Sequence, residues 1–441
     1  MSDYPETLQI EPTNACNYSC SMCLNSRFTN QSNFLLPLEI FQKIAEESFP
    51  YISRLVLYGM GEPLVHPNFI EMLQIARKYL SKNATIFFTT NGSLLDKGKI
   101  DFILENKLAD EIAFSCDELI QKESSIHEHV LKNQTVQSNL SYLLNHENRS
   151  QVKIGISSVI MKSNIETIEE LVENLIEYGV DYISISHLFP YFEYLKDQVM
   201  FTMISNEALP ILEEVGEEWK ELVLGYTREL FAEQMQTSYK ERYKVSEKIV
   251  EKQRPYSRKY KDLLEKAKNM DVLLNISLYE IERDKIKILY KLKNIFSDLK
   301  RRSKEKGVTL LLPDIFPVFS ERKCPYNTTN TLVIRSDGET AQCFNYLWEH
   351  ETFLNSHTRK SSNYSLGNVK EKTIKEIWTQ ESYQETRNKM KKMNENIPYC
   401  GDCSFSSNNC FYATEYSSDC WGNEPFCSEC PYSVNLIKCL L

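Results

Sequence analysis

Cysteine is the residue type whose placement in this chain most clearly suggests chemistry. The 441 residues contain 13 cysteines, and twelve of these lie in two regions that are far apart in the sequence. The two groups are Cys16, Cys20 and Cys23, and then Cys324, Cys343, Cys400, Cys403, Cys410, Cys420, Cys427, Cys430 and Cys439. The first residues have neither the basic nor the apolar part of a secretory signal, so we expect a cytoplasmic protein with reduced thiols. Many thiols in a reducing compartment indicate metal or redox chemistry, here in two regions.

The first group lies in one short segment, Glu11-Pro12-Thr13-Asn14-Ala15-Cys16-Asn17-Tyr18-Ser19-Cys20-Ser21-Met22-Cys23. Its spacing is C-x3-C-x2-C, and it directly follows the first predicted strand. Three thiolates on one loop can bind three irons of a [4Fe–4S] cluster and leave the fourth iron open for another ligand. A structural zinc ion normally takes four protein ligands, so three cysteines fit zinc less well. The alternatives are three unrelated cysteines, or a zinc loop that borrows a distant ligand.

This loop resembles the signature of radical S-adenosylmethionine (SAM) enzymes. The resemblance implies a partial (β/α)6 barrel, with the open iron chelated by the amino and carboxylate groups of SAM. It also implies that the reduced cluster cleaves SAM to methionine and a 5′-deoxyadenosyl radical. In that family the residue before the third cysteine is often aromatic and packs on the adenine, whereas here it is Met22. Because a methionine sulfur can contact a ring face, we expect Met22 to cover the adenine with weaker pre-organisation.

A second motif, Gly59-Met60-Gly61-Glu62-Pro63, ends the second predicted strand. It resembles the Gly-Gly-Glu-Pro segment of the same family, whose backbone receives an ammonium group, with Met60 at the first glycine. Glycine allows a close approach of the backbone to a ligand. Glu62 can add a charge-assisted hydrogen bond or hold the loop. Taken alone, Gly-x-Gly-Glu-Pro is also a common turn.

Further predicted strand ends carry polar residues that match the family less closely. Asn91 ends the third strand within Thr-Asn-Gly, Ser115 and Asp117 end the fourth, and Ser157 lies on the fifth with Asn164 just beyond it. Ligands of α/β barrels bind at the C-terminal ends of the strands, so we expect these side chains to contact the cofactor. Ordinary turn chemistry is the alternative, because Asn-Gly and Ser are turn formers.

The second cysteine group resembles the SPASM extension of radical SAM enzymes, which binds two auxiliary [4Fe–4S] clusters. Cys324-x13-Gly338-x4-Cys343 matches the first half of that pattern, and the second half is stretched. The family order implies that Cys324 and Cys343 share one cluster with Cys420. It implies a second cluster on the following cysteines: Cys400, Cys403 and Cys410, with one of Cys427, Cys430 and Cys439. Nine cysteines thus compete for eight positions.

A zinc ribbon is the alternative interpretation of this tail. It would use the pairs Cys400/Cys403 and Cys427/Cys430, since paired C-x2-C makes a good tetrahedral site. The segment Asp419–Cys430 is also similar to the end of SPASM proteins associated with the maturation of tungsten-pterin oxidoreductases. Two other residues have structural interpretations: Cys116 is expected to be a buried thiol, and His187 a hydrogen-bonded structural histidine.

Six short, nearly continuous apolar runs must position these motifs. They are Leu8–Thr13, Arg54–Met60, Ala84–Asn91, Glu111–Asp117, Val152–Ile160 and Tyr182–Pro190. Such runs are typical of parallel strands that are buried on both faces. The segments between them are long enough for crossover helices, most clearly Ile165–Tyr178, with Gly179 as its C-terminal cap. The pattern predicts an α/β fold, either an open doubly wound sheet or a barrel, and the resemblance selects a partial TIM-like (β/α)6 barrel.

We expect three parts in the chain. Residues 1–195 form the barrel core, 196–310 are charged, mainly helical, and complete or cover the barrel, and 320–441 form the cysteine-rich iron–sulfur domain. Beyond the core, the predicted elements are a helix over Asp284–Arg302, strands over Val308–Leu312, Thr331–Arg335 and Glu339–Phe344, and a helix around Ile374–Trp378 and Tyr383–Met390.

Composition limits the partners. A net charge of −10 argues against a nucleic-acid or anionic-membrane binder, and no run approaches the ~18 apolar residues of a membrane span. The resemblance implies a radical SAM oxidoreductase or maturase with a ferredoxin or flavodoxin as electron donor. The catalytic residues stay unassigned.

The usual SPASM substrate is a peptide or protein side chain. The first strand begins near residue 8, which leaves no room for a fused leader-peptide-binding domain. A peptide would therefore be recognised by a separate partner or by residues 191–306. The alternatives are a small-molecule substrate, maturation of a tungsten-pterin oxidoreductase, or a non-catalytic, zinc-stabilised interaction protein.

Overall fold

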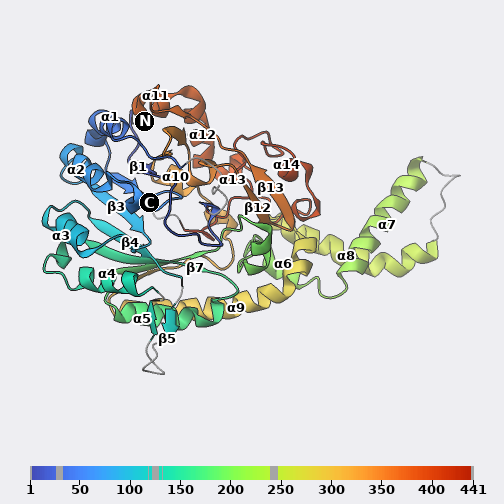
Figure 1. The fold of residues 1–441 in the computed structure, drawn as a ribbon. Coiled ribbons are helices and arrows are strands. Elements are labelled where there is room, and N and C mark those ends of the chain that lie inside the picture. The colour runs from blue at the N-terminus through green and yellow to red at the C-terminus, as the bar shows by residue number, and fades with distance from the viewer. Residues whose placement is uncertain are drawn as a thin grey trace.

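The computed structural model describes residues 2–25, 33–117, 119–121, 129–131, 133–238 and 247–438. Within these ranges a single ten-stranded sheet organises the molecule (Figure 1). In sheet order its strands are β14 (Gly367–Asn368), β11 (Glu339–Ala341), β10 (Thr331–Ile334), β1 (Thr7–Ile10), β2 (Arg54–Leu57), β3 (Thr85–Thr90), β4 (Glu111–Ser115), β7 (Lys153–Ile160), β8 (Tyr182–His187) and β9 (Thr309–Leu311).

The six strands predicted from the apolar runs are confirmed and lie next to one another, all parallel, from β1 to β8. Their core residues are almost wholly buried because the sheet is covered on both sides. Two small hairpins lie outside this sheet: β5 (Leu119–Gln121) with β6 (His129–Leu131), and β12 (His350–Leu354) with β13 (His357–Ser361). The architecture is an α/β fold built on a parallel sheet.

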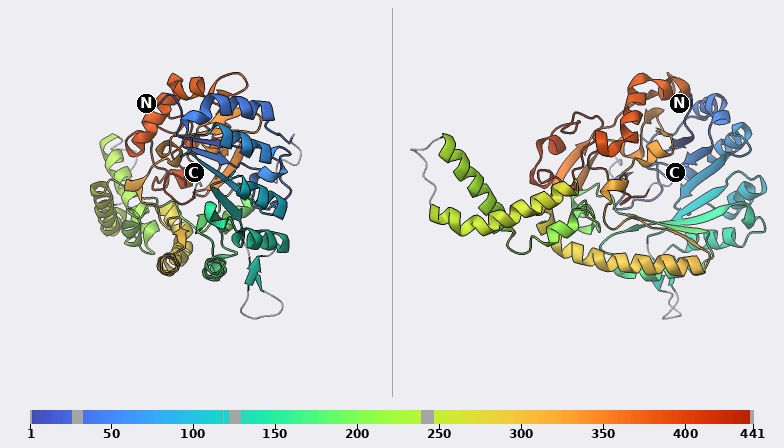
Figure 2. Two further views of the ribbon diagram at one scale, coloured as in Figure 1. Left: turned by 90° about the vertical axis from the view of Figure 1, so that its left-hand side faces the viewer. Right: turned by 180° about the vertical axis from the view of Figure 1, so that it is seen from behind.

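Crossover helices cover the outer face of the sheet (Figure 2). They are α1 (Leu38–Ser48), α2 (Phe69–Tyr79), α3 (Lys97–Glu105), α4 (Gln134–Leu144) and α5 (Ile168–Glu177). The helix predicted over Ile165–Tyr178 is a 3-10 turn, η5 (Ile165–Thr167), followed by α5, which buries Ile168, Leu171, Val172 and Leu175. Gly179 follows with a φ of +78°, the left-handed conformation that favours glycine at a helix end.

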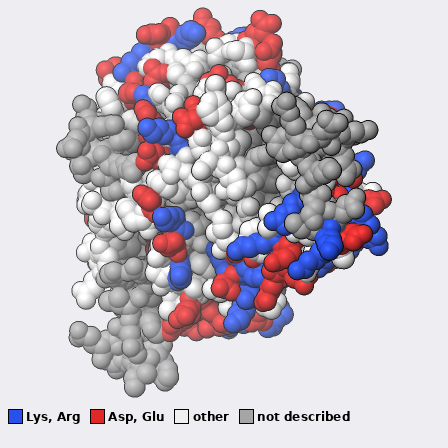
Figure 3. All heavy atoms as spheres, turned by 90° about the vertical axis from the view of Figure 1, so that its right-hand side faces the viewer, with Lys and Arg blue, Asp and Glu red and all other residues white. Residues whose placement is uncertain are grey.

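The charged region is helical. It contains α6 (Leu209–Glu213), α7 (Trp219–Ser238), α8 (Glu247–Asn269) and α9 (Ile276–Glu305). Helices α7 and α8 form an arm that projects from the body, whereas α9 runs beside α5 under the sheet (Figures 1 and 2). Arg302 of α9 forms ion pairs with Glu169 and Glu173 of α5. On the side of the arm, acidic and basic side chains intermix, as expected for solvated helix faces (Figure 3).

The C-terminal part joins the core through strand pairing. Strand β10 is parallel to β1, with Leu8 opposite Leu332, and it continues into the antiparallel strands β11 and β14. Its helices are α10 (Pro325–Thr328), α11 (Ile374–Thr379), α12 (Glu381–Lys391), α13 (Met393–Asn396) and α14 (Phe411–Thr414). The helix predicted around residues 374–390 is thus two helices, because Gln380 leaves the helical conformation with ψ near 141°. The sheet therefore carries the cysteine-rich part beside the first strand.

None of the helices in the described parts of the chain combines the length and the apolar character needed to cross a lipid bilayer.

Candidate active site and metal centres

The loop with the first three cysteines leaves the sheet at the end of β1. Within it, the Cys23 N–H donates to the Cys20 carbonyl at 3.0 Å, and the Tyr18 N–H lies 3.4 Å from the Cys16 sulfur. Burial, with a smaller contribution from the neighbouring thiols of Cys20 and Cys16, raises the pKa of Cys23 to about 11. Three thiols crowded together need a cation to become thiolates, which is what iron ions supply.

The Gly-Met-Gly-Glu-Pro segment packs directly on the cysteine loop. The Glu62 N–H donates to the Ala15 carbonyl at 2.9 Å. A methyl group on Gly61 would lie 2.4 Å from the carbonyl oxygens of Thr13 and Ala15, far inside van der Waals contact. Only glycine allows this approach, so Gly61 fixes the spacing between the two motifs. At Gly59, a methyl group would overlap the Glu11 side chain.

The carboxylate of Glu62 holds this segment to the end of β3. It accepts hydrogen bonds from the Thr90 hydroxyl at 2.7 Å, the Asn91 N–H at 2.6 Å and the Leu64 N–H at 3.1 Å. Burial raises the pKa of Glu62, and these three donors act in the opposite direction. Of the two roles considered for Glu62, the observed contacts are those of a residue that holds the loop.

Asn91 lies against the cysteine loop. Its amide nitrogen donates to the Asn17 side-chain oxygen at 2.9 Å and lies 4.0 Å from the Cys16 sulfur. The Asn17 amide donates in turn to the Ser93 hydroxyl at 2.8 Å. The pair Asn17 and Ser93 was not predicted as part of the site, because a solvent-exposed loop asparagine and a serine after Asn-Gly carry no distinctive sequence signal.

The remaining strand-end residues lie at the same edge of the sheet. Ser115 is opposite Ser157 in the register of β4 and β7. Asp117 accepts from the Val159 N–H at 2.7 Å, and its charge raises the pKa of Cys20, whose main shift comes from burial. Asn164 instead binds the backbone of its own loop, at Met161 and Val159.

Met60 and Met22, the two methionines of the motifs, are at least half-buried. Met60 belongs to the cluster of apolar residues between the cysteine loop and the C-terminal part, and Met22 packs against that cluster.

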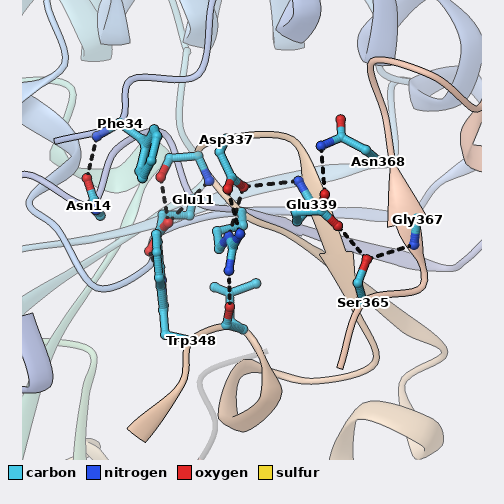
Figure 4. A network of polar contacts seen from close by, with 12 residues as sticks. Glu11, Asn14, Phe34, Asp337, Glu339, Trp348, Ser365, Gly367 and Asn368 are labelled. Carbon is cyan, nitrogen blue, oxygen red and sulfur yellow. Dashed lines mark hydrogen bonds and ion pairs between the residues drawn. The ribbon is translucent and has the colours of Figure 1, made fainter. Parts of the chain in front are cut away.

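A buried carboxylate that the sequence did not single out joins these motifs to the C-terminal part. Glu11, at the end of β1, accepts from the Met60 N–H at 2.8 Å and the Ser336 hydroxyl at 2.8 Å. It also accepts from the Trp348 indole N–H at 3.3 Å (Figure 4). Burial raises its pKa. Its motif was noted in the sequence, but its partners lie 49 to 337 residues away, and no local pattern reveals such contacts.

Eight of the nine C-terminal cysteines fall within the described residues and form two sets of four. The Cys324 set consists of Cys324, Cys343, Cys427 and Cys430, which line one small cavity of about 40 Å³. Burial, with smaller contributions from neighbouring thiols of the set, raises the pKa of Cys324 to about 12 and that of Cys343 well above its usual range. The Gln342 amide lies 3.7 Å from the Cys427 sulfur.

The Cys400 set consists of Cys400, Cys403, Cys410 and Cys420, which line a second cavity of about 290 Å³. Burial raises the pKa of Cys400, and nearby charges, including that of Cys403, raise it further. Cys420 is exposed, and the charges of Cys403 and Cys410 both raise its pKa, after burial. Four thiols around one cavity provide the four thiolates that a fully ligated [4Fe–4S] cluster needs.

This grouping differs from the family order at two points. Cys420 was expected to join Cys324 and Cys343, and one of Cys427, Cys430 and Cys439 was expected to complete the Cys400 set. Two hydrogen bonds account for this grouping. The Asn423 amide donates to the Asn396 carbonyl at 2.9 Å and holds the Cys420 turn beside the Cys400 loop. The Lys323 N–H donates to the Ser433 carbonyl at 2.8 Å and holds the Cys430 segment beside Cys324.

The pairs of the proposed zinc ribbon, Cys400/Cys403 and Cys427/Cys430, belong to different sets. Within the described ranges, no three His, Cys, Asp or Glu side chains converge as ligands of a single metal ion. In an iron–sulfur cluster each thiolate binds its own iron, so the four thiolates of a set need not converge on one metal ion. Cys439, the ninth cysteine, lies outside the described residues.

The sequence predicted structural roles for Cys116 and His187, and the surroundings of both side chains agree with such roles. Cys116 is buried in the main hydrophobic core. The His187 Nε2 lies 3.1 Å from the Asp314 carbonyl oxygen, and burial lowers the pKa of this histidine to about 4.

Comparisons with known proteins agree with both cysteine regions. The family model described as "Radical SAM superfamily" matches residues 10–140, and the model "SPASM: Iron-sulfur cluster-binding domain" matches residues 324–404. A "Tungsten-containing aldehyde ferredoxin oxidoreductase cofactor-modifying protein" from Pyrococcus furiosus is 25% identical over 98% of this chain and 96% of its own length. A GTP 3′,8-cyclase from Chlorobaculum tepidum is 34% identical over 25% of this chain and 33% of its own.

Among solved structures, Streptococcus suis SuiB bound to precursor peptide SuiA has the same fold, with a TM-score of 0.52 and 14% identity over 92% of this chain and 71% of that chain. The family matches fall on the two regions where the thiols gather around the end of β1 and in the C-terminal cavities. The chain therefore contains a radical SAM domain and a SPASM iron–sulfur cluster-binding domain, and it is an enzyme whose cofactors are [4Fe–4S] clusters and SAM.

Proposed function

We propose that this enzyme is a maturase that modifies the pterin cofactor of a tungsten-containing oxidoreductase. The observation that carries the proposal is the match to the Pyrococcus furiosus cofactor-modifying protein, which spans nearly the whole of both chains. The resemblance of the Asp419–Cys430 segment to the end of such maturases points the same way. Because the match extends over the helical arm and the cysteine-rich tail as well as the core, we expect all parts of this chain to serve that task.

In this proposal, Cys16, Cys20 and Cys23 hold the cluster that binds SAM. The bound cluster and SAM supply a one-electron cleavage that yields a carbon radical able to abstract hydrogen from an unactivated position. The protein's task is to fix the geometry and exclude water. Glu62 holds the segment over the loop, and Gly61 sets its distance.

The backbone of Gly59, Met60 and Gly61 and the side chains that surround the loop would hold SAM. Asn91, Ser115, Asp117 and Ser157 lie at the same edge of the sheet as the cysteines, and Met22 belongs to the loop itself. Their supply of hydrogen-bond donors and acceptors suits a ligand with amino, carboxylate and ribose hydroxyl groups.

The Cys324 set and the Cys400 set each hold one auxiliary [4Fe–4S] cluster. Four thiolates for each cluster leave all irons protein-bound, which suits electron transfer better than substrate activation. The reductant is a low-potential carrier, a ferredoxin or a flavodoxin. In this division of the chain, residues 1–195 carry out the SAM chemistry, residues 196–310 form the helical cover, and residues 320–441 transfer electrons.

A peptide or protein side chain is the second candidate substrate. It is supported by a groove of about 830 Å³ between η6 (Glu193–Gln198), α9 and the β12–β13 hairpin. Positively and negatively charged side chains line this groove, among them Lys196, Lys285, Glu282 and Asp284. A structural relative with the same fold binds its precursor peptide.

Co-expression separates the two candidates. A tungsten-containing aldehyde oxidoreductase is purified from anaerobic cells with the wild-type chain, or with a variant in which Cys16, Cys20 and Cys23 are alanine. Mass spectrometry then compares the released pterin cofactor and the oxidoreductase polypeptide. The proposal predicts a pterin of different mass only with the wild-type chain, and an unchanged polypeptide. A changed polypeptide mass with an unchanged pterin supports the second candidate, and no change in either mass contradicts both.

A further inference from the structure

A buried arginine lies between the two cysteine sets of the C-terminal part. Arg322 is 5% exposed and lies two residues before Cys324, just after the 3-10 turn η7 (Phe319–Glu321). Its guanidinium donates to the carbonyl oxygens of Ile397 at 2.9 Å, Pro398 at 3.1 Å and Cys427 at 3.0 Å. Its Nε lies 3.4 Å from the Ser433 hydroxyl. All of these acceptors are neutral.

These acceptors belong to segments of both sets. Ile397 and Pro398 lead directly into Cys400, whereas Cys427 is itself a member of the Cys324 set and Ser433 follows Cys430. The guanidinium carbon also lies 5.3 Å from the centre of the Tyr399 ring. One side chain thus ties the segment before the Cys400 loop to the Cys427–Ser433 segment.

The charge of Arg322 lies beside segments of both sets, because its guanidinium bonds the carbonyl oxygen of Cys427 and those of the two residues that lead into the Cys400 loop. A buried cation is costly unless negative charge lies close by, and its hydrogen-bond partners supply only dipoles.

We propose that Arg322 is a shared electrostatic positioning residue that raises the reduction potentials of both auxiliary clusters. The inference rests on the proposed function in that both cysteine sets must hold clusters. Four thiolates give each [4Fe–4S] site a net negative charge, and each added electron makes that charge larger. A fixed positive charge in a low-dielectric interior stabilises the reduced form more than the oxidised form. Because one guanidinium serves both sites, the two potentials move together.

Two other buried arginines provide matched controls. Arg359 lies over the Phe426 ring and lines the cavity of the Cys324 set. Arg387 lies over the Trp378 ring and donates to the Trp378 carbonyl at 2.9 Å. Removal of the Arg359 charge is expected to affect one cluster, and removal of the Arg387 charge neither.

The test is an anaerobic redox titration of the reconstituted full-length chain, followed by electron paramagnetic resonance. Double variants that remove one set at a time, C343A/C427A and C403A/C410A, assign the two auxiliary signals. In R322Q both signals should show at least a tenfold lower ratio of reduced to oxidised cluster at a fixed potential, a shift of about 59 mV. R322K keeps the charge and should stay close to wild type, R359Q should shift one signal, and R387Q none.

Iron and sulfide analysis of the wild-type chain tests the presence of the auxiliary clusters separately from the role of Arg322. A wild-type chain with only about four irons would contradict the auxiliary clusters themselves, and with them the proposed roles of both sets. With about twelve irons, unchanged potentials in R322Q, or a shift of one signal alone, would overturn the shared role of Arg322. If R322Q lost iron, the R322M and R322K pair would provide the same comparison, since both keep a long side chain.

Discussion

The two cysteine regions differ in how the chain builds them. The N-terminal site places three thiols on one loop of eight residues, Cys16 to Cys23, and the loop is held by the ends of neighbouring parallel strands. The C-terminal sets gather four thiols each from segments up to 106 residues apart, such as Cys324 and Cys430, held by turns and buried side chains. Three ligands leave one iron open for SAM, whereas four ligands close a cluster to exogenous ligands.

The position of each cysteine region in the fold determines how accessible it is to a ligand. The N-terminal loop lies at the strand ends, where α/β folds bind ligands, and polar groups such as Asn91 and Asp117 surround it. The Cys324 set lines a cavity of only about 40 Å³ beside α12, with aromatic and apolar side chains around it. One region is therefore built to receive a molecule and the other to retain a cofactor.

The largest expected effect comes from removing the N-terminal ligands. The variant C16A/C20A/C23A should lose formation of 5′-deoxyadenosine entirely, and its iron content should fall from about twelve to about eight per chain. Chromatography of the nucleoside and iron analysis after anaerobic reconstitution provide the two measurements. Cys116→Ala, in the hydrophobic core, is the matched control and should keep both values. Deoxyadenosine formation that persists in the triple variant would break the distinction between the regions.

The grouping of the C-terminal cysteines is tested by paired substitutions. C343A/C427A and C403A/C410A each remove two ligands from a single set and should each cost about four irons. C343A/C420A removes one ligand from each set and should damage both clusters, with up to about eight irons lost. The family order predicts the opposite for this pair, a loss of about four. Since the two sets supply eight ligands, Cys439→Ala should lose no iron.

A smaller effect is expected where the two N-terminal motifs touch. In Gly61→Ala the new methyl group would press on the carbonyl oxygens of Thr13 and Ala15, so the cysteine loop must shift. We expect at least a tenfold weaker affinity for SAM, about 1.4 kcal/mol, by equilibrium dialysis, with the auxiliary irons retained. Gly98→Ala, whose nearest contact would be 3.5 Å, is the control and should bind SAM normally. An unchanged SAM affinity in Gly61→Ala would contradict the role of this contact.

The smallest effect is expected where the core sheet contacts the C-terminal tail. His187 of β8 contacts the Asp314 carbonyl, and Asp314 is tied to Asn435 of the tail by two hydrogen bonds of 2.9 Å. The pKa of His187 is lowered to about 4 by burial, so the folded protein keeps it neutral while the unfolded chain protonates it below about 6.5. Stability should therefore fall as the pH drops from 6.5 towards 4, by about 1 kcal/mol at pH 5.5.

Thermal unfolding of the holoenzyme at pH 7.0 and pH 5.5 measures this effect. The control is His187→Gln, whose amide can still donate to Asp314 but does not titrate. The variant should lose less stability than the wild type between the two pH values. Equal losses would show that His187 does not contribute to the pH dependence.

The sequence predicted the sheet well because its signal is local. Each of the six core strands is a short apolar run, and burial on both faces makes such runs easy to recognise. The turn at Gly179 and the helix α5 follow from equally local patterns. The pairing of β10 with β1 was not predicted, because it joins residues more than 300 positions apart and leaves no mark on either segment alone.

The cysteine sites also differ in how well the sequence predicted them. The spacing of Cys16, Cys20 and Cys23 could be interpreted from sequence, since all three ligands lie on one loop. The partners of Cys420 could not, because a hydrogen bond between Asn423 and Asn396 decides which loop it faces. The same holds for Glu11 and Arg322, whose contacts come from distant segments. Local spacing thus predicts an open, single-loop site better than a closed one.

The most direct test of the central claim is addition of SAM to the reduced, fully reconstituted enzyme with electron paramagnetic resonance as the readout. If one region is open and the other closed, SAM should change the signal of one cluster only, and that signal should be missing from C16A/C20A/C23A. The signals that remain in this variant should not respond to SAM. A response to SAM from the clusters of the Cys324 or Cys400 set would contradict the account.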